Sequence, residues 1–376
     1  MLTNIPVRAN FGAMLLGAAI GIVALSALLP ELPNSAAFED LALGLETHPF
    51  YARFDGHPVH CKDLTDVESC LSARRESGIE DVVLWLGNSQ LHAVNQLKAG
   101  ETSAADRLHR WLRTADRYLM VLSQPNANLQ EHYLLLEYLS SRDPVKTLIL
   151  PLVFDDMRED GIRPSLSGMV ADPLVFDRLS ITSTGRALRQ SHENRDLGSN
   201  DMSALRDTPQ EIVEKHLNDA LADYWTVWRE RPWFRGQIYN GLYLFRNTIF
   251  GIKASSIRKV IPGRYAMNRQ ALKDMLDVAA SYGIFVYAYI APLRNDVTPP
   301  YDPSEYALFK KDMSALLNKP GAAFLDLENL VPGSFWGQKE ATTLGGQPEV
   351  DFMHFQAPGH ALLAQALWDW TRFAAK

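Results

Sequence analysis

One stretch near residue 81 constrains the fold more than any other part of the chain. Residues 82–86 form an apolar run of strand length that ends at Gly87, and Asn88, Ser89 and a segment of helical character follow. This order predicts a buried strand, a tight turn and a helix, a geometry that lifts a serine hydroxyl clear of a sheet edge. The alternative is that Ser89 only caps the next helix, a common role for serine.

The rest of the chain alternates between strand and helix patterns. The apolar, strand-like runs cover residues 82–86, 117–123, 147–154, 284–290 and 322–327. The helical patterns cover residues 90–98, 104–114, 128–140, 268–282, 304–318 and 357–373. Apolar strands separated by helices indicate a flavodoxin-like α/β sandwich of three layers, with a parallel sheet of about five strands covered on both faces. Functional residues in such sheets lie beyond the carboxyl ends of the strands, a condition that Ser89 meets.

A second motif stands near the C-terminus. Asp351 and His354 follow a glycine-rich, irregular segment that we expect to be a loop, and they precede the last helix. At this spacing the carboxylate can accept a hydrogen bond from one imidazole nitrogen and leave the other facing a serine. His92 and His360 lie in predicted helices and are less free to point at the sheet edge. The sequence therefore predicts a triad of Ser89, His354 and Asp351 that activates the serine as a nucleophile.

The N-terminus predicts export. Residues 11–29 are uncharged and apolar, close to the about 20 residues that span a bilayer. Arg8 precedes this run and acidic residues follow it, so the positive-inside rule places residues 1–10 in the cytoplasm. We expect an uncleaved transmembrane anchor at residues 11–30. A signal peptide cleaved near Ser26 is the alternative, and it exports the rest of the chain equally.

Domain organisation follows from length and from one break in the pattern. The 376 residues exceed what one core needs, which indicates a domain with an insertion. We expect a juxtamembrane segment at residues 31–79 and an α/β domain at 80–376. A mostly helical insertion at about 160–265 is expected over the functional edge of the sheet. The net charge of −7 argues against nucleic acid as a partner.

Two short segments leave alternatives open. Cys61 and Cys70, the only cysteines, are expected to form a disulfide that closes a loop between anchor and domain in an oxidising compartment. A metal site with His57 and His60 is the less favoured interpretation, because no second ligand cluster follows. The aromatic residues of 224–234 are typical of a core, and a sugar-stacking or lipid-facing surface is the functional alternative.

Other polar residues are expected at the same sheet edge. Asn126 and Asn128 follow the strand pattern of 117–123, and their amides are candidates to stabilise an oxyanion beside the backbone N–H of Ser89. A turn or a helix cap is the alternative role for each. The remaining candidate substrate contacts are Asn88, Gln90, Asp155 and Arg158. For Arg158, a surface ion pair with Asp155 or Asp156 is favoured over binding of an anionic substrate.

The motifs resemble those of the SGNH, or GDSL-type, hydrolases. Gly87-Asn88-Ser89 is similar to their first block, with Asn where Asp is usual, and Asp351-x-x-His354 is similar to their last. The resemblance covers residues 80–156 and 280–375 and implies the SGNH fold. The family's oxyanion asparagine follows the third strand, where this chain has Asp155-Asp156 instead. With the anchor, the chain most resembles the DltD/AlgJ/AlgX branch of cell-envelope acyltransferases.

This resemblance implies a function. We expect a single-pass protein of the inner membrane with its domain in the periplasm, which needs no cofactor and acylates an envelope polysaccharide or glycolipid through an acyl-serine intermediate. The resemblance also implies a membrane-bound O-acyltransferase as partner. A periplasmic carbohydrate esterase or deacetylase of the same fold is the first alternative. A non-catalytic carbohydrate-binding assembly protein is the second.

Overall fold

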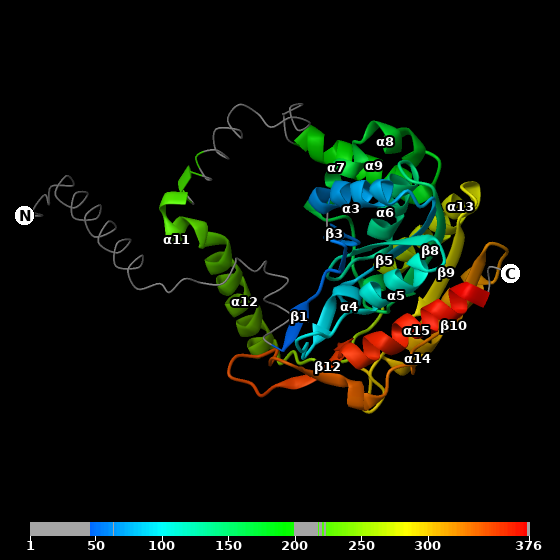
Figure 1. Cartoon of the computed structure of the whole chain (residues 1–376). Helices are drawn as coiled ribbons and strands as arrows, with labels where there is room; N and C mark the ends of the chain where they lie inside the picture. Colours follow the sequence, from blue (N-terminus) through cyan, green and yellow to red (C-terminus); the bar gives the residue numbers. More distant parts are fainter. Residues whose placement is uncertain (1–45, 63, 199–216, 218–219, 222, 374–376) are drawn as a thin grey trace, which may run out of the picture. The chain divides into compact units, whose positions relative to one another are not determined.

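Figure 1 shows the computed structural model of the chain, which describes residues 46–62, 64–198, 217, 220–221 and 223–373. Within these residues, 46–198 and 247–373 form one compact unit, and those between 217 and 246 belong to another. The second unit contains α11 (Thr226–Arg229) and most of α12 (Arg231–Phe250). All of the predicted strand–helix alternation lies in the first unit.

The first unit is built on a six-stranded sheet in which every neighbouring pair is parallel. In spatial order its strands are β10 (Ala322–Asp326), β9 (Phe285–Ile290), β8 (Val145–Leu152), β5 (Asp81–Gly87), β7 (Arg117–Ser123) and β4 (His60–Cys61). Each predicted apolar run is a strand of this sheet. The sixth strand, β4, was missed because two residues are too short for a periodic pattern. The strand order is compatible with a flavodoxin-like fold.

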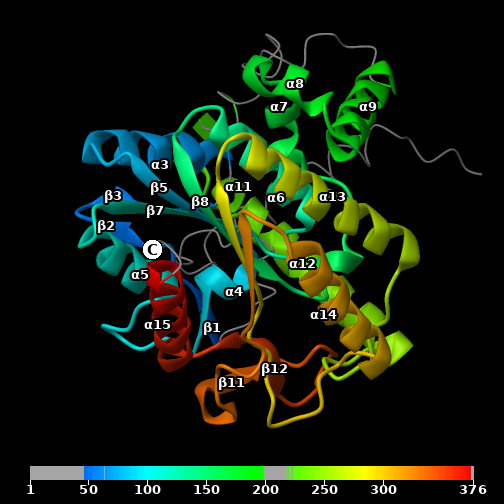
Figure 2. The ribbon, with the colours of Figure 1, turned by 90° about the vertical axis from the view of Figure 1, so that its right-hand side faces the viewer.

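Helices cover both faces of the sheet, which explains why its central strands are apolar on both sides (Figure 2). One face carries α5 (Ala104–Arg113) and α15 (Ala357–Phe373), which pack against each other. The other face carries α3 (Leu64–Ser77), α6 (Leu129–Ser140), α13 (Pro262–Ser281) and α14 (Pro303–Leu317). This division follows from right-handed crossovers between parallel strands.

The direction of winding reverses at β5. The chain runs from β5 to β7 on one side and then returns across β5 to β8 on the other. The carboxyl ends of β5 and β8 therefore meet where the winding reverses, the place at which sheets of this class bind ligands. Ser89 follows β5 at this point, and Asp156 follows β8.

Two antiparallel strand pairs belong to the same unit. They are β11 (Trp336–Lys339) with β12 (Glu349–Phe355), and β1 (Thr47–Pro49) with β6 (Ala93–Asn95). Asp351 and His354 lie on β12, a strand that was not predicted, and the irregular segment expected before them also contains β11. The helix expected at 90–98 is only the single turn α4 (Ser89–His92), after which β6 begins. The residue pattern of 93–95 is compatible with either a helix or a strand. The segment is a strand because it pairs with β1.

The first part of the insertion is helical, as predicted, but lies elsewhere than expected. Its helices are η2 (Pro164–Leu166), α7 (Ser167–Val170), α8 (Pro173–Leu179) and α9 (Ser183–Gly198). They pack against one another and against α6 and α13 on one face of the sheet. Two described segments of the insertion reach the carboxyl edge: Arg163 donates to the backbone oxygen of Pro125 after β7, and Arg258 forms an ion pair with Asp155.

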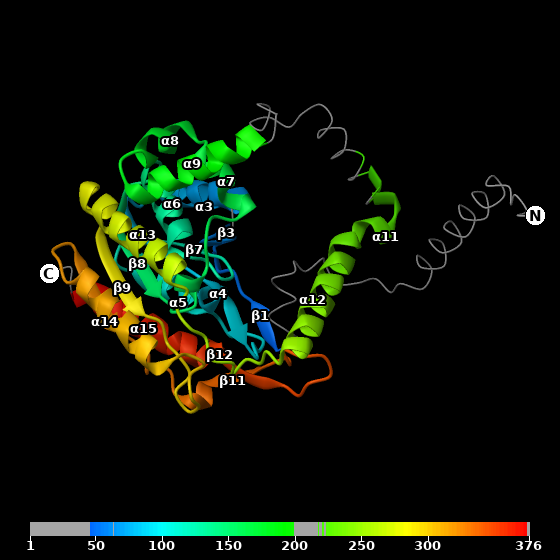
Figure 3. The ribbon, with the colours of Figure 1, turned by 180° about the vertical axis from the view of Figure 1, so that it is seen from behind.

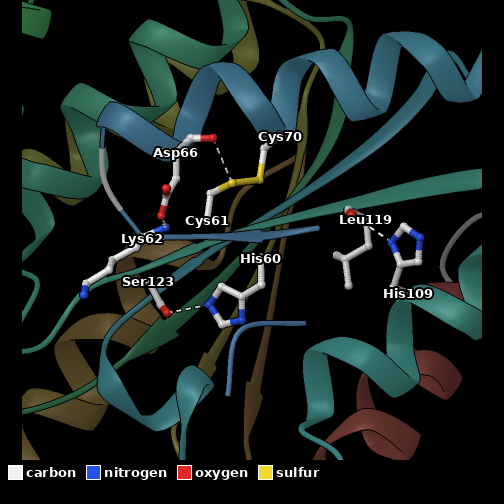
Figure 4. The surroundings of a disulfide bond; sticks show 8 residues. All are labelled: His60, Cys61, Lys62, Asp66, Cys70, His109, Leu119 and Ser123. Carbon is white, nitrogen blue, oxygen red and sulfur yellow. Dashed lines mark hydrogen bonds between the residues drawn. A yellow bond between two sulfur atoms is a disulfide. The ribbon is translucent and has the colours of Figure 1, made fainter. Parts of the chain in front are cut away.

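Cys61 and Cys70 form a disulfide that joins β4 to α3 (Figure 4). The pair therefore belongs to the sheet unit rather than to a loop outside it, and this unit begins well before residue 80. The short pair β2 (Arg53–Phe54) and β3 (His57–Pro58) precedes it. The anchor expected at residues 11–30 lies outside the described residues. Within them, no helix combines the length and apolarity needed to cross a membrane.

Candidate active site

Ser89, His354 and Asp351 lie together although they come from distant parts of the chain. The hydroxyl of Ser89 is 2.9 Å from Nε2 of His354, across 265 positions of sequence. Nδ1 of the same imidazole is 3.0 Å from Oδ2 of Asp351. Ser89 and His354 are partly exposed, whereas Asp351 is buried. A carboxylate, an imidazole and a hydroxyl are thus aligned in the order that the sequence predicted.

The environment of Asp351 favours its charged form. Burial raises the pKa of the carboxyl, but the charge and hydrogen bonds of His354 and the backbone N–H of Met353 outweigh burial and lower it to about 2. Oδ1 of Asp351 accepts hydrogen bonds from the backbone N–H groups of Met353 and His354, each at 2.9 Å. Asn95 Nδ2 donates to Oδ2 at 3.3 Å. An ionised Asp351 holds the proton of His354 on Nδ1, which leaves Nε2 free to accept the serine proton.

The turn that carries Ser89 depends on the two residues before it. A Cβ at Gly87 would overlap the side chain of Leu91, so the helix α4 can fold back onto its strand only over a glycine. Asn88 caps α4 by accepting the backbone N–H of Gln90 at 3.0 Å. Its amide nitrogen donates to both carboxyl oxygens of Asp156 at 3.0 Å. Asn88 is therefore a buried positioning residue and not an exposed substrate contact.

Gln90 connects the serine to the histidine strand. Its amide Nε2 donates to the backbone oxygens of Pro292 and Met353, each at 2.9 Å. Pro292 follows β9 and Met353 directly precedes His354, so one buried side chain ties α4 to two other segments of the edge. Gln90 was expected to contact substrate. In this structure its side-chain amide instead connects α4 to the segments that contain Pro292 and Met353.

Asp155 and Arg158 pair with each other rather than facing Ser89. Arg158 Nη1 is 3.4 Å from Asp155 Oδ1, and its Nε donates to the backbone oxygen of Lys259 at 2.9 Å. Asp155 also accepts from Arg258 and from the hydroxyl of Tyr301. The ion-pair alternative for Arg158 thus describes its observed contacts.

Among the described residues, no Lys or Arg forms an ion pair with the neighbouring carboxyl, Asp156. It is 4 % exposed and lies four residues beyond the end of β8, and burial raises its pKa well above the ordinary value despite the hydrogen bond from Asn88. Its contact with Asn88 was not predicted. A fold-level signal was available, since the loop that follows β8 lies next to the end of β5 in a sheet of this order.

The two asparagines proposed for the oxyanion lie in other roles. Asn126 is exposed in a turn and has a φ of 52°, which suits an asparagine. Asn128 caps α6: its Oδ1 accepts the backbone N–H groups of Gln130 and Glu131, and its Nδ2 donates to Gly161 at 2.8 Å. The alternative roles therefore match the structure: Asn126 lies in a turn, and Asn128 caps a helix.

A donor that sequence reasoning missed stands at the end of β7. Gln124 directly follows Ser123, which pairs with Gly87, and its backbone N–H donates to Gly87 at 3.2 Å. The side chain is 4 % exposed, and among the described residues its Nε2 has no hydrogen-bond partner. A buried amide without an acceptor is unfavourable and rare in folded proteins. Gln124 therefore brings a donor to the strand end beside Asn88 and Ser89.

A second serine lies between two histidines beneath α4. Ser123 Oγ is 2.6 Å from His60 Nε2 and 2.7 Å from His92 Nδ1, and Tyr51 stacks on His92 (Figure 4 shows His60 and Ser123). Burial lowers the pKa of His60 to about 3 and that of His92 well below its ordinary value. We call Ser123, His60 and His92 the buried histidine cluster. Among the described residues, no group of three or more His, Cys, Asp or Glu is arranged to hold a metal ion.

The arrangement at Ser89 is equipped for nucleophilic catalysis. The hydroxyl has a general base within hydrogen-bond distance, the base has a carboxylate that orients it, and the pair is accessible from solvent. Comparison with known proteins adds no assignment, because no protein-family model and no curated protein matches the chain.

Proposed function

We propose that the protein is an exported, membrane-anchored serine enzyme of the SGNH type that transfers acyl groups through Ser89. The observation that carries the proposal is the chain of hydrogen bonds from Asp351 through His354 to Ser89 at 3.0 and 2.9 Å. The parallel sheet supports it, because the serine follows the strand at which the winding reverses. The uncharged run at residues 11–29 supports the anchor and the periplasmic location.

The proposed reaction has two acyl-transfer steps. Ser89 Oγ attacks an acyl carbonyl while His354 Nε2 takes the hydroxyl proton, and the imidazolium is stabilised by Asp351. The tetrahedral intermediate collapses, His354 protonates the leaving group, and acyl-Ser89 remains. A hydroxyl then attacks this ester, with His354 as base, and releases Ser89. The acceptor hydroxyl belongs to an envelope carbohydrate in a transferase and to water in an esterase.

Two donors are proposed to stabilise the oxyanion. The first is the backbone N–H of Ser89, which stands at the first position of a helix, where intrahelical hydrogen bonds leave it unsatisfied. The second is Nε2 of Gln124, the buried donor on the adjoining strand end. Removing one such donor costs about 3–4 kcal/mol of transition-state stabilisation in enzymes of this kind. Gln124 here takes the role that the resemblance assigns to an asparagine after the third strand.

Labelling by a fluorophosphonate probe tests the nucleophile. The full-length protein should form one covalent adduct, and the Ser89→Ala variant should form none. Ser123→Ala is the matched control, since it removes a hydroxyl that also contacts imidazoles but is buried. Retained labelling in Ser89→Ala, or lost labelling in a folded Ser123→Ala, contradicts the assignment of the nucleophile.

Transfer and hydrolysis are separated by the fate of the acyl group. The protein is incubated with an acetyl ester and envelope-type oligosaccharides, and acetylated sugar and free acetate are both quantified. Excess acetylated sugar supports the transferase, which we propose acts with a membrane-bound O-acyltransferase that supplies acyl groups. Free acetate alone favours the esterase. The absence of both in a labelled, folded protein contradicts acyl transfer onto these carbohydrates.

A further inference from the structure

Helix α12 carries an apolar stripe that the proposed active site does not use. The stripe consists of Ile238, Leu242, Phe245 and Ile249. These positions recur at the spacing of one helix face, and their exposed fractions are 62, 57, 53 and 61 %. A second row on its shoulder consists of Tyr239, Tyr243 and Phe250, which are 54, 40 and 71 % exposed. Contiguous exposed apolar surface of this kind marks an interaction site.

Asn247 and the stripe lie on opposite sides of α12. Asn247 is completely buried, and its Nδ2 donates to the backbone oxygen of Thr342 at 3.0 Å. At 3.6 residues per turn, Asn247 is roughly 140–200° around the helix from the four residues of the stripe. Figure 3 shows α12 as one continuous helix, so the stripe runs straight along it.

The charge of this segment is opposite in sign to that of the whole chain. Helix α12 contains Arg231, Arg235 and Arg246 and neither Asp nor Glu, and residues 251–260 add Lys253 and Lys259 besides Arg258, which pairs with Asp155. The chain as a whole has a net charge of −7. Arg235 and Arg246 are exposed and lie one turn from stripe residues, at positions i−3 of Ile238 and i+4 of Leu242. Such side chains cover apolar surface with their stems while the guanidinium reaches polar surroundings.

We propose that α12 lies flat on an anionic membrane surface, with the stripe among the acyl chains and its arginines at the lipid phosphates. The combination of an apolar face, flanking cations and low overall hydrophobicity is that of interfacial helices. Tyrosines on the shoulder of the stripe suit the headgroup level. The excess of basic over acidic residues in the sequence of this segment matches anionic lipid, and the anchor proposed at residues 11–30 would keep the segment near a bilayer. Acyl transfer at Ser89 is not required for the docking.

A fluorescent probe on the stripe tests the proposal in the full chain. The two cysteines are joined in a disulfide, so Leu242→Cys introduces a single reactive thiol. The variant is labelled with an environment-sensitive dye and placed in nanodiscs of phosphatidylglycerol and phosphatidylethanolamine. Lipids with a doxyl group on the acyl chain should quench the dye and its emission should shift to the blue. Nanodiscs of phosphatidylcholine alone should give weaker quenching, because they lack the anionic charge.

Four further variants provide the controls. Gln237→Cys labels an exposed position about 110° around the helix from the centre of the stripe, which should be quenched less than position 242. Arg235→Gln and Arg246→Gln, each combined with Leu242→Cys, should lower the ratio of docked to undocked helix about fivefold per charge. Ser89→Ala combined with Leu242→Cys should be quenched as Leu242→Cys alone is, which separates this docking from the proposed reaction.

Three results would overturn the proposal. Equal quenching of the dye at positions 237 and 242 would show that α12 does not contact the membrane preferentially through the stripe. Equal quenching in anionic and zwitterionic nanodiscs would remove the role of the cations. A dye at 242 that is shielded from iodide in water but is not reached by doxyl lipid would show that protein covers the stripe, either a partner or a second copy.

Discussion

Two serines of the sheet unit, Ser89 and Ser123, lie within hydrogen-bond distance of imidazoles, and they differ in whether they are arranged for catalysis. Ser89 is 2.9 Å from His354, and Ser123 is 2.6 Å from His60 and 2.7 Å from His92. Ser123 is 1 % exposed, however, and Ser89 is partly open to solvent. Distance alone would rank the buried histidine cluster first. Access to solvent reverses the order.

The second difference is the carboxylate. Asp351 orients His354 and can stabilise the imidazolium that forms when the serine proton moves. In the part of the chain that the structure describes, His60 Nδ1 and His92 Nε2 have no hydrogen-bond partner, so no carboxylate orients either ring. Burial keeps both imidazoles neutral by lowering their pKa values. The single proton of Ser123 can be donated to only one of the two imidazoles, so the other must donate to Ser123. These bonds hold α4 to β7 and β4 rather than activate a nucleophile.

The largest expected effect comes from the exposed imidazole. His354→Ala should lower kcat/KM for an activated acetyl ester by about 10,000-fold or more, because the general base is lost. His60→Gln should leave kcat/KM nearly unchanged, since a glutamine can still bond Ser123. Similar losses of activity in both variants, with both shown to be folded by circular dichroism, would contradict the distinction between His354 and the buried histidine cluster.

The orienting carboxylate gives the next effect. Asp351→Asn keeps an oxygen for the two backbone N–H groups but points an amide donor at His354 Nδ1, which favours the wrong imidazole tautomer. We expect a loss of about 10,000-fold in kcat with the fold intact. Asp155→Asn, at the same sheet edge but paired with Arg258, is the control and should change kcat little. Similar losses in both variants would contradict a special role for Asp351.

The proposed oxyanion donor should give a smaller effect. Gln124→Met preserves side-chain length but removes the amide, and kcat should fall about 100-fold or more with KM unchanged. Gln130→Met removes a second buried amide whose Nε2 also has no partner among the described residues, and it serves as control. A change in KM alone for Gln124→Met would assign Gln124 to substrate binding instead.

The smallest expected effect is on stability at acidic pH. His60 of the buried histidine cluster and Asp351 of the triad should lose their contributions to the free energy of unfolding in different pH ranges. The pKa of His60 is lowered to about 3 by burial, whereas an unfolded histidine titrates near 6.5. Its contribution is therefore complete above about pH 6.5 and is lost as the pH falls toward 3, at about 1.4 kcal/mol per pH unit. The pKa of Asp351 is about 2, so its contribution is lost only between about pH 4 and 2.

Chemical unfolding of His60→Gln between pH 6 and pH 4 measures this difference. The variant keeps a partner for Ser123 but binds no proton at residue 60. Its free energy of unfolding should therefore fall less steeply than that of the unsubstituted protein, by about 1.4 kcal/mol per pH unit. Parallel curves would show that His60 is not the residue that binds protons on unfolding in this range.

Much of the frame could be predicted from local patterns. The apolar runs became strands, and the cap at Asn128 and the strand–turn–helix at Ser89 follow from residue types within a few positions. The strand β12 was missed because its alternation is weak, and it exists through pairing with β11. Asn126 and Asn128 were placed at the correct edge, but hydrogen bonds to nearby backbone groups decided what Asn128 does.

The sequence by itself determined the sheet, the turn at Ser89 and the residue types of the triad, because helix and strand periods are local properties. Only the tertiary structure decided that His354 reaches Ser89 across 265 residues, that Ser123 is enclosed by His60 and His92, and that Asp156 is buried against Asn88. The physical reason is that accessibility and hydrogen-bond partners depend on which distant strand ends meet. The order of the strands in the sheet determines which strand ends are neighbours, and no local sequence pattern contains that order.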